Sequence, residues 1–304
     1  MSPRSGPSRG RRTRRCAVLL VAATTVALGL TAGPTAPPAA AGLPDLQQVV
    51  DDEVMQASEQ GIEQSVAVVD RATGAMVASA GGRDQYISES IVKLFTVAYY
   101  EVQNAGHPDP ALSARLRTMI VESDDAIQSA LWSTAIVPAM AARYGLSDTE
   151  NGPRTDSQDW GWELITADDE ATFLYRMAND PLVAPLLMDA MAHVQPVGAD
   201  GFDQDFGLNA LPGDHGSKQG WTDIGAGPPL QIHSVGWTDR YFVAILQTSD
   251  TADDDALRDQ STATATAILA AESGLSPGFL RLRAGVVDVA WSLVDAVTGT
   301  ATGR

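Results

Sequence analysis

The stretch "YISESIVKLFT", residues 86–96, holds one of only two lysines in a chain of 304 residues. The second is Lys218, in "HGSKQGWTD", and the other 18 basic residues are arginine. Arginine keeps its proton in proteins, whereas lysine can lose its proton when burial or nearby positive charge lowers its pKa. We therefore predict that both lysine positions need an amine in a chemical role that arginine cannot fill.

Lys93 follows Ser90 by three positions, at the start of a stretch with a helical pattern. Positions i and i+3 share one face of a helix, so the hydroxyl and the amine can meet. A serine hydroxyl becomes a nucleophile when a base removes its proton, and a neutral lysine can be that base. Ser90 and Lys93 are thus a candidate nucleophile and base. The alternative is an exposed serine beside a surface lysine.

The chain predicts strands near both ends and helices between them. Turn residues separate two β-branched runs in 64–82, which predicts a hairpin, and three further strands are expected within 215–223, 228–237 and 240–248. Helices are expected in 43–61, through most of 91–191, and in 254–273. We therefore expect an α/β fold of the α+β kind, with a five-stranded antiparallel sheet assembled from both chain ends, flanking helices and an inserted all-helical lobe.

Two further motifs accompany the first. Ser123, Asp124 and Asp125 occur on a stretch expected to be helical, and Lys218-Gln219-Gly220 lies on the first late strand. In order and context the three resemble the S-x-x-K, S-D-N and K-T-G signatures of class A β-lactamases and penicillin-binding proteins. The resemblance runs from about residue 65 to residue 273, and both lysines of the chain occupy the lysine positions of the motifs. It implies a β-lactamase-like fold.

The resemblance also implies roles for individual residues. Ser90 would be the acylated nucleophile and Lys93 its base or part of the base relay. Ser123 would pass a proton to the leaving nitrogen, and Lys218 would hold positive charge near that serine and the substrate. The backbone amides of Ser90 and Trp221 would form the oxyanion hole. The residues expected to bind substrate are Asp125, Gln219, Gly220 and Trp221.

Several positions depart from the family pattern. Asp125 replaces an asparagine and, when ionised, can only accept hydrogen bonds. Gln219 replaces a threonine, and Trp221 is bulky where the family often has small residues. No E-x-x-L-N pattern occurs between Gly145 and "ITADDEATFL", so the only candidates there for activating a deacylating water are Glu150, beside Asn151, and Glu163. Efficient turnover of a β-lactam is not predicted.

These observations predict an exported serine hydrolase or acyl-transferase that forms an acyl-enzyme on Ser90 with a β-lactam, a peptidoglycan-type peptide, or a related amide or ester. No cofactor is expected. No metal is expected either, because His107, His193, His215 and His233 lack metal-ligand spacing. The alternative is a catalytically impaired binding or regulatory protein of the cell envelope that keeps the same fold.

The N-terminal region predicts export. Six arginines precede the apolar run "CAVLLVAATTVALGLTAG", and small residues follow it up to Ala41. An uncleaved anchor is the alternative, because the run approaches spanning length. Cys16 stands at the start of the run instead of closing it, which argues against a lipid-modified cysteine. Loss of the six arginines would move the formal charge from -18 to -24, which disfavours nucleic acid as a partner.

The expected organisation is a signal peptide in 1–41, a discontinuous sheet lobe in 42–89 and 210–274, a helical lobe in 90–209, and an appendage in 275–304. The appendage contains Asp288 and Asp295 within its apolar stretch, so no membrane span is expected there. The mature protein should be secreted or held in the cell envelope, without a stable membrane span once the signal is cleaved.

Cleavage of the signal makes a first prediction. Mass spectrometry of the exported protein should find a mature N-terminus near Gly42. Exported protein that still carries Arg4 to Arg15 would contradict cleavage and favour an anchor.

Overall fold

The computed structural model describes residues 45–222 and 229–274, so the predicted signal peptide and appendage lie outside the described residues. Its main sheet is antiparallel, with strand order β2-β1-β7-β6-β5. The strands are β1 (Glu63–Asp70), β2 (Met76–Ala80), β5 (Gly216–Trp221), β6 (Leu230–Trp237) and β7 (Tyr241–Ser249). The predicted five-stranded sheet from both ends of the chain is confirmed, and its two central contacts join the N-terminal β1 to the C-terminal β7 and β7 to β6.

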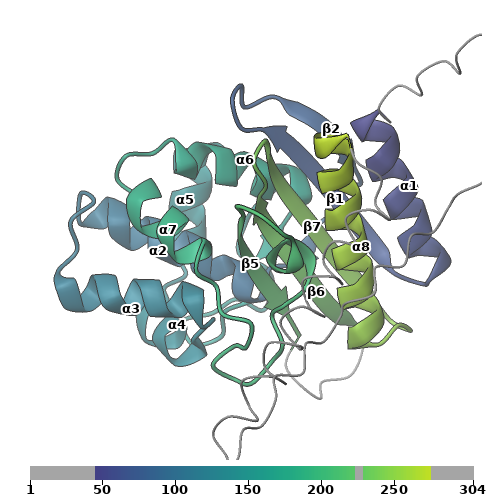
Figure 1. The fold of residues 1–304 in the computed structure, drawn as a ribbon. Coiled ribbons are helices and arrows are strands. Elements are labelled where there is room, and N and C mark those ends of the chain that lie inside the picture. The colour runs from purple at the N-terminus through teal and green to yellow at the C-terminus, as the bar shows by residue number, and fades with distance from the viewer. Residues whose placement is uncertain (1–44, 223–228, 275–304) are drawn as a thin grey trace, which may run out of the picture. The chain divides into compact units, whose positions relative to one another are not determined.

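Alternation along the strands divides the core into two layers. In β7, Val243 and Ile245 pack with α1 (Leu46–Glu59) and α8 (Asp254–Ser273), whereas Phe242 and Ala244 belong to the cluster on the other face. That second cluster contains residues of α6 (Ala167–Ala178). Figure 1 shows α1 and α8 side by side on one side of the sheet. Both faces are thus buried, which explains the nearly continuous apolar sequence of β1 and β7.

The remaining helices lie between β3 (Tyr86–Ile87) and β5 in the chain and form the predicted helical part. They are α2 (Val92–Gln103), α3 (Pro110–Val121), α4 (Asp125–Leu131), α5 (Ile136–Tyr144) and α7 (Ala184–Met191). Figure 1 shows them gathered beside the sheet. Phe95 of α2 packs on Phe173 of α6, with ring centroids 4.6 Å apart, so the same apolar cluster joins these helices to the sheet.

The expectation of helix throughout most of 91–191 misses one structural element. Residues 147–163 are largely irregular, and β4 (Leu164–Ile165) pairs with β3 (Tyr86–Ile87) in a second, two-stranded sheet. Two residues are too few to show alternation, so the sequence did not reveal these strands. The pairing brings the 147–163 loop to the segment that precedes Ser90. None of the helices in the described ranges is long and apolar enough to cross a membrane.

Candidate active site

Ser90 lies in a strained turn between β3 and α2. A short 3₁₀ turn, Glu89–Ile91, carries the serine, and Lys93 belongs to the first turn of α2. Glu89 has a φ of 47°, which is uncommon for a residue with a side chain. Strain of this kind persists only where surrounding contacts hold it, and it concentrates at functional sites. Ser90 and Lys93 are therefore three positions apart across a 3₁₀ turn that leads into a helix.

Neighbouring elements hold this turn in place. The backbone N–H groups of Ser88 and Glu89 donate to the carbonyls of Glu163 and Gly161, at 2.8 and 2.9 Å. The His233 ring of β6 accepts the Gln247 N–H at Nδ1, so Nε2 carries the proton and donates to the Ile87 carbonyl at 2.8 Å. Burial lowers the pKa of His233 to about 4, which keeps the ring neutral. The His233 ring thus holds the segment that precedes Ser90 in place.

The predicted catalytic residues meet in one cluster. Lys93 Nζ is 2.7 Å from Ser90 Oγ, 3.0 Å from Ser123 Oγ and 2.9 Å from the Ser123 carbonyl oxygen. Lys218 Nζ donates to Ser123 Oγ at 2.8 Å. Both lysine side chains are fully buried. Ser123 Oγ is therefore shared between the two lysines of the chain.

Ser123 occupies a turn, which corrects the expected helix. It lies between α3 and α4 with a φ of 53°, and Asp124 caps α4 by accepting the Ile127 N–H. Asp125 is the first residue of α4. The turn aims both the carbonyl and the hydroxyl of Ser123 at Lys93. A regular helix would have used that carbonyl within the helix.

Asp125 forms an ion pair that alters the chemistry of Lys93. Its Oδ1 lies 2.5 Å from Lys93 Nζ, and its side chain is about half exposed at 52%. Burial lowers the pKa of Lys93, and the negative charge of Asp125 opposes that shift without reversing it. Burial, with the charge of Lys93, also places the pKa of Lys218 well below its usual value. Both amines are thus prepared to lose a proton more readily than a lysine in water.

Strand β5 supplies an unpaired backbone edge next to Ser90. It is the last strand of the sheet, and the Thr222 N–H donates across to the Gln231 carbonyl of β6. Because successive N–H groups of a strand point in opposite directions, the Trp221 N–H faces the free edge. A side chain at Gly220 would lie 3.1 to 3.4 Å from Ile91, Ser88 and Glu89. Gly220 therefore lets β5 pack against the turn that carries Ser90.

The side chains of two predicted binding residues pack against the protein around the site. Gln219 is fully buried and donates to Ser217 Oγ at 3.0 Å, while its backbone carbonyl accepts from Lys218 Nζ at 2.7 Å. The Trp221 ring stacks on Phe202, with centroids 4.6 Å apart and planes at 8°. Their side chains thus support the site, and their backbone polar groups lie at the edge of β5 that faces it.

The structure adds two residues that the sequence did not identify. The Trp160 ring centroid lies 4.9 Å from Lys93 Nζ. Asp200 accepts the Trp221 Nε1–H at 3.0 Å, and the Trp221 ring centroid is 5.3 Å from Lys218 Nζ. Both residues come from irregular segments without periodicity, so no pattern pointed to them.

Neither glutamate proposed for water activation contacts Ser90 in the hydrogen bonds of the described residues. Glu163 is fully buried and accepts from Ser88 Oγ, the Gly161 N–H and Thr155 Oγ1, at 3.1, 2.8 and 3.1 Å. Burial raises the pKa of Glu163 against these hydrogen bonds. Glu150 is exposed and pairs its backbone with Leu164. Glu163 thus fixes the 147–163 loop to the nucleophile segment.

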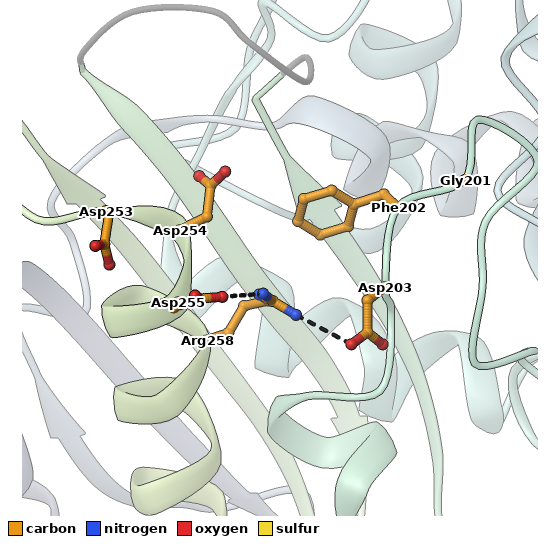
Figure 2. Close-up of a pocket in the computed structure, with 7 residues that line it drawn as sticks. All are labelled: Gly201, Phe202, Asp203, Asp253, Asp254, Asp255 and Arg258. Atoms are coloured by element: carbon orange, nitrogen blue, oxygen red, sulfur yellow. Dashed lines mark hydrogen bonds and ion pairs between the residues drawn. The ribbon is translucent and has the colours of Figure 1, made fainter.

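Figure 2 shows an acidic hollow of about 380 Å³ lined by residues of the 201–203 segment and of the start of α8. Phe202, whose ring stacks on Trp221, is one of its walls. Arg258 pairs there with Asp203 and Asp255, and Asp253 caps α8. The hollow contains no nucleophile or lysine. No group of metal-ligating side chains suited to an ion occurs within residues 45–222 and 229–274.

Solved structures that share this fold include class A β-lactamases. The enzyme from Bacteroides cellulosilyticus aligns with a TM-score of 0.60 and 15% identity, over 75% of this chain and 99% of its own. The class A enzyme from Mycobacterium abscessus aligns with a TM-score of 0.55 and 16% identity, over 74% of this chain and 99% of its own. The predicted β-lactamase-like fold is therefore confirmed. Identities this low establish the fold alone.

A curated relative lies closer in sequence. The "Putative lipoprotein LppW" of Mycobacterium tuberculosis is 31% identical over 245 residues, which cover 74% of this chain and 76% of the relative. The LppW of Mycobacterium bovis matches equally well. No protein-family model matches the chain. The chain thus belongs to the same family as the mycobacterial LppW proteins and has the fold of class A β-lactamases.

Proposed function

We propose that the protein is an acyl-transferring serine hydrolase that forms an acyl-enzyme on Ser90. The observation that carries this proposal is the 2.7 Å contact between Ser90 Oγ and the buried amine of Lys93. The second lysine, joined through Ser123, completes a set of groups for moving one proton. The substrate would be an amide or ester, with a β-lactam or a peptidoglycan-type peptide as candidates.

Acylation would follow from these positions. Neutral Lys93 removes the Ser90 proton as Oγ attacks the carbonyl carbon. The negative charge on the carbonyl oxygen is stabilised by the backbone N–H groups of Ser90 and Trp221. When the bond to the leaving nitrogen or oxygen breaks, Ser123 gives that atom a proton and recovers one from the lysines beside it. The ester on Ser90 then awaits water or another acceptor.

The fate of the ester depends on the 147–163 loop. Glu163 is held by three donors, and Glu150 faces solvent, so neither carboxylate is arranged to activate water at Ser90. Slow deacylation follows from this arrangement, and a long-lived acyl-enzyme suits transfer to an amine better than rapid hydrolysis.

A second candidate function has an observation in its favour. The close Asp125 carboxylate stabilises the charged form of Lys93, which cannot act as a base. On that basis the protein could bind an envelope ligand without turnover. Its place in the envelope is supported by the predicted export signal and by the name of the LppW relatives, although Cys16 stands at the start of the apolar run.

The direct test is covalent labelling. The mature protein is treated with a fluorescent penicillin and, in parallel, with an uncharged fluorophosphonate, and the modified peptide is located by mass spectrometry. Label on Ser90 that is lost in Ser90→Ala supports the proposal. Absence of any adduct with both reagents, in folded protein, favours the binding function.

The two lysines should respond differently to arginine. Lys93→Arg should slow acylation of Ser90 by ~10²-fold to 10⁴-fold, because arginine cannot act as the base. Lys218→Arg keeps the positive charge and should retain measurable acylation, whereas Lys218→Ala should lose more. Rates of labelling are compared after circular dichroism has verified folding. A folded Lys93→Arg protein that acylates at the wild-type rate would exclude Lys93 as the base.

Removal of the Asp125 charge should shift the pH dependence of acylation. A base must be deprotonated, so the rate rises as pH passes through the pKa of Lys93. Asp125 raises that pKa against burial, so Asp125→Asn should move the rise to lower pH. Asp189→Asn, in an exposed pair with Arg117, is the matched control and should leave the profile in place. An unchanged profile in Asp125→Asn would show that this pair does not govern the base.

Deacylation should limit turnover of any β-lactam. At saturating nitrocefin, we expect about one equivalent to react in a burst, followed by slow release. Sustained turnover on the order of 10 per second or more would contradict the expectation that no residue of the 147–163 loop activates water. In that case Glu163→Gln and Glu150→Gln would identify the group that activates water.

A further inference from the structure

The positive charges of the site are hidden and its negative charges are exposed. Lys93 and Lys218 are fully buried, whereas Asp125 and Asp200 are exposed. Asp125 is bound to Lys93, and Asp200 is fixed beside Lys218 through Trp221. The charged groups of the site that solvent and ligands can reach are therefore these carboxylates, not the amines.

The lysines also have little hydrogen-bonding capacity left for an anion. An ammonium has three donors. Four oxygens already surround Lys93 Nζ, from Ser90, Ser123 and Asp125. Lys218 Nζ already donates to Ser123 Oγ and the Gln219 carbonyl, which leaves one donor. A carboxylate on a ligand would have to displace these partners.

Asp125 lacks the hydrogen-bond donor that an amide would offer at this position. Its carboxylate accepts and cannot donate, so it matches a ligand N–H or ammonium and repels a carbonyl or carboxylate. The nearby hollow continues the same sign, with Asp203, Asp253, Asp254 and Asp255 against Arg258 alone. Clefts lined by one sign of charge concentrate ligands of the other sign.

We propose that the Ser90 site selects acyl donors that carry an ammonium group and discriminates against donors that carry a carboxylate. This inference rests on the proposed function, because it assigns a substrate class to the same serine. It makes penicillins and cephalosporins, which carry a carboxylate, poor mimics of the natural substrate. An amine-bearing peptide ester or amide fits the arrangement.

The test uses reversible serine ligands that need no turnover. Three phenylboronic acids with a para aminomethyl, methyl or carboxyl group differ mainly in charge, and their Kd values can be measured by calorimetry on the mature protein. The aminomethyl compound should bind about tenfold more tightly than the carboxyl compound at low ionic strength, with the methyl compound between them. The ratio should shrink in 0.5 M salt, because these carboxylates are exposed.

Variants distinguish the site from the general acidity of the chain. Asp200→Asn should reduce the ratio several-fold, whereas Asp189→Asn changes the net charge equally but lies in a separate exposed pair and should leave the ratio unchanged. Should Asp200→Asn fail to fold, Asp125→Asn removes the other carboxylate of the site and is compared with Asp189→Asn in the same way.

The outcomes separate the two proposals. Binding of the carboxyl compound as tightly as the aminomethyl compound, with loss of both in Ser90→Ala, would overturn the charge preference and leave the serine hydrolase intact. A ratio that Asp200→Asn and salt leave unaltered would also overturn it. Failure of all three boronic acids to bind the folded protein would overturn the proposed function together with this inference.

Discussion

The burial of the Lys93 amine is the constraint on which the site depends. A buried ammonium must be paired or must release its proton, since removing an isolated charge from water is costly. Here four oxygens from three residues meet the amine. The three residues come from different local structures: a 3₁₀ turn, a strained turn and the start of a helix. The positive φ values of Glu89 and Ser123 are the local backbone cost of this convergence.

The rest of the architecture holds those turns in place. The β3–β4 pair, the Glu163 carboxylate and the neutral His233 ring secure the segment before Ser90. Gly220 lets the edge of β5 lie against the same turn, and Trp221 is locked by Phe202 and Asp200. Glu163 illustrates how position decides role: the carboxylate that could have activated water is used to hold a loop.

The sequence predicted the parts that have a repeating or chemical signature. Alternation and turn residues identified the five main strands, and the scarcity of lysine identified Lys93 and Lys218 as members of one site. The geometry of Ser123 could not be predicted, because its left-handed backbone depends on tertiary contacts and not on a local pattern. Trp160 and Asp200 were missed for a related reason: each enters from an irregular segment whose path is fixed only by packing. The assigned roles and the division into lobes remain predictions.

The central pairing of β1 with β7 has a consequence for how the chain acquires reactivity. These neighbouring strands come from opposite ends of the folded region, and the contact of Ser123 with Lys218 spans 95 positions. Contacts so distant in sequence form late, since a long loop must close first. Ser90 therefore cannot meet its complete set of partners until β5 to β7 have emerged. A partly synthesised chain would therefore carry Ser90 without its buried amines, and the site would be assembled only after the late strands have formed.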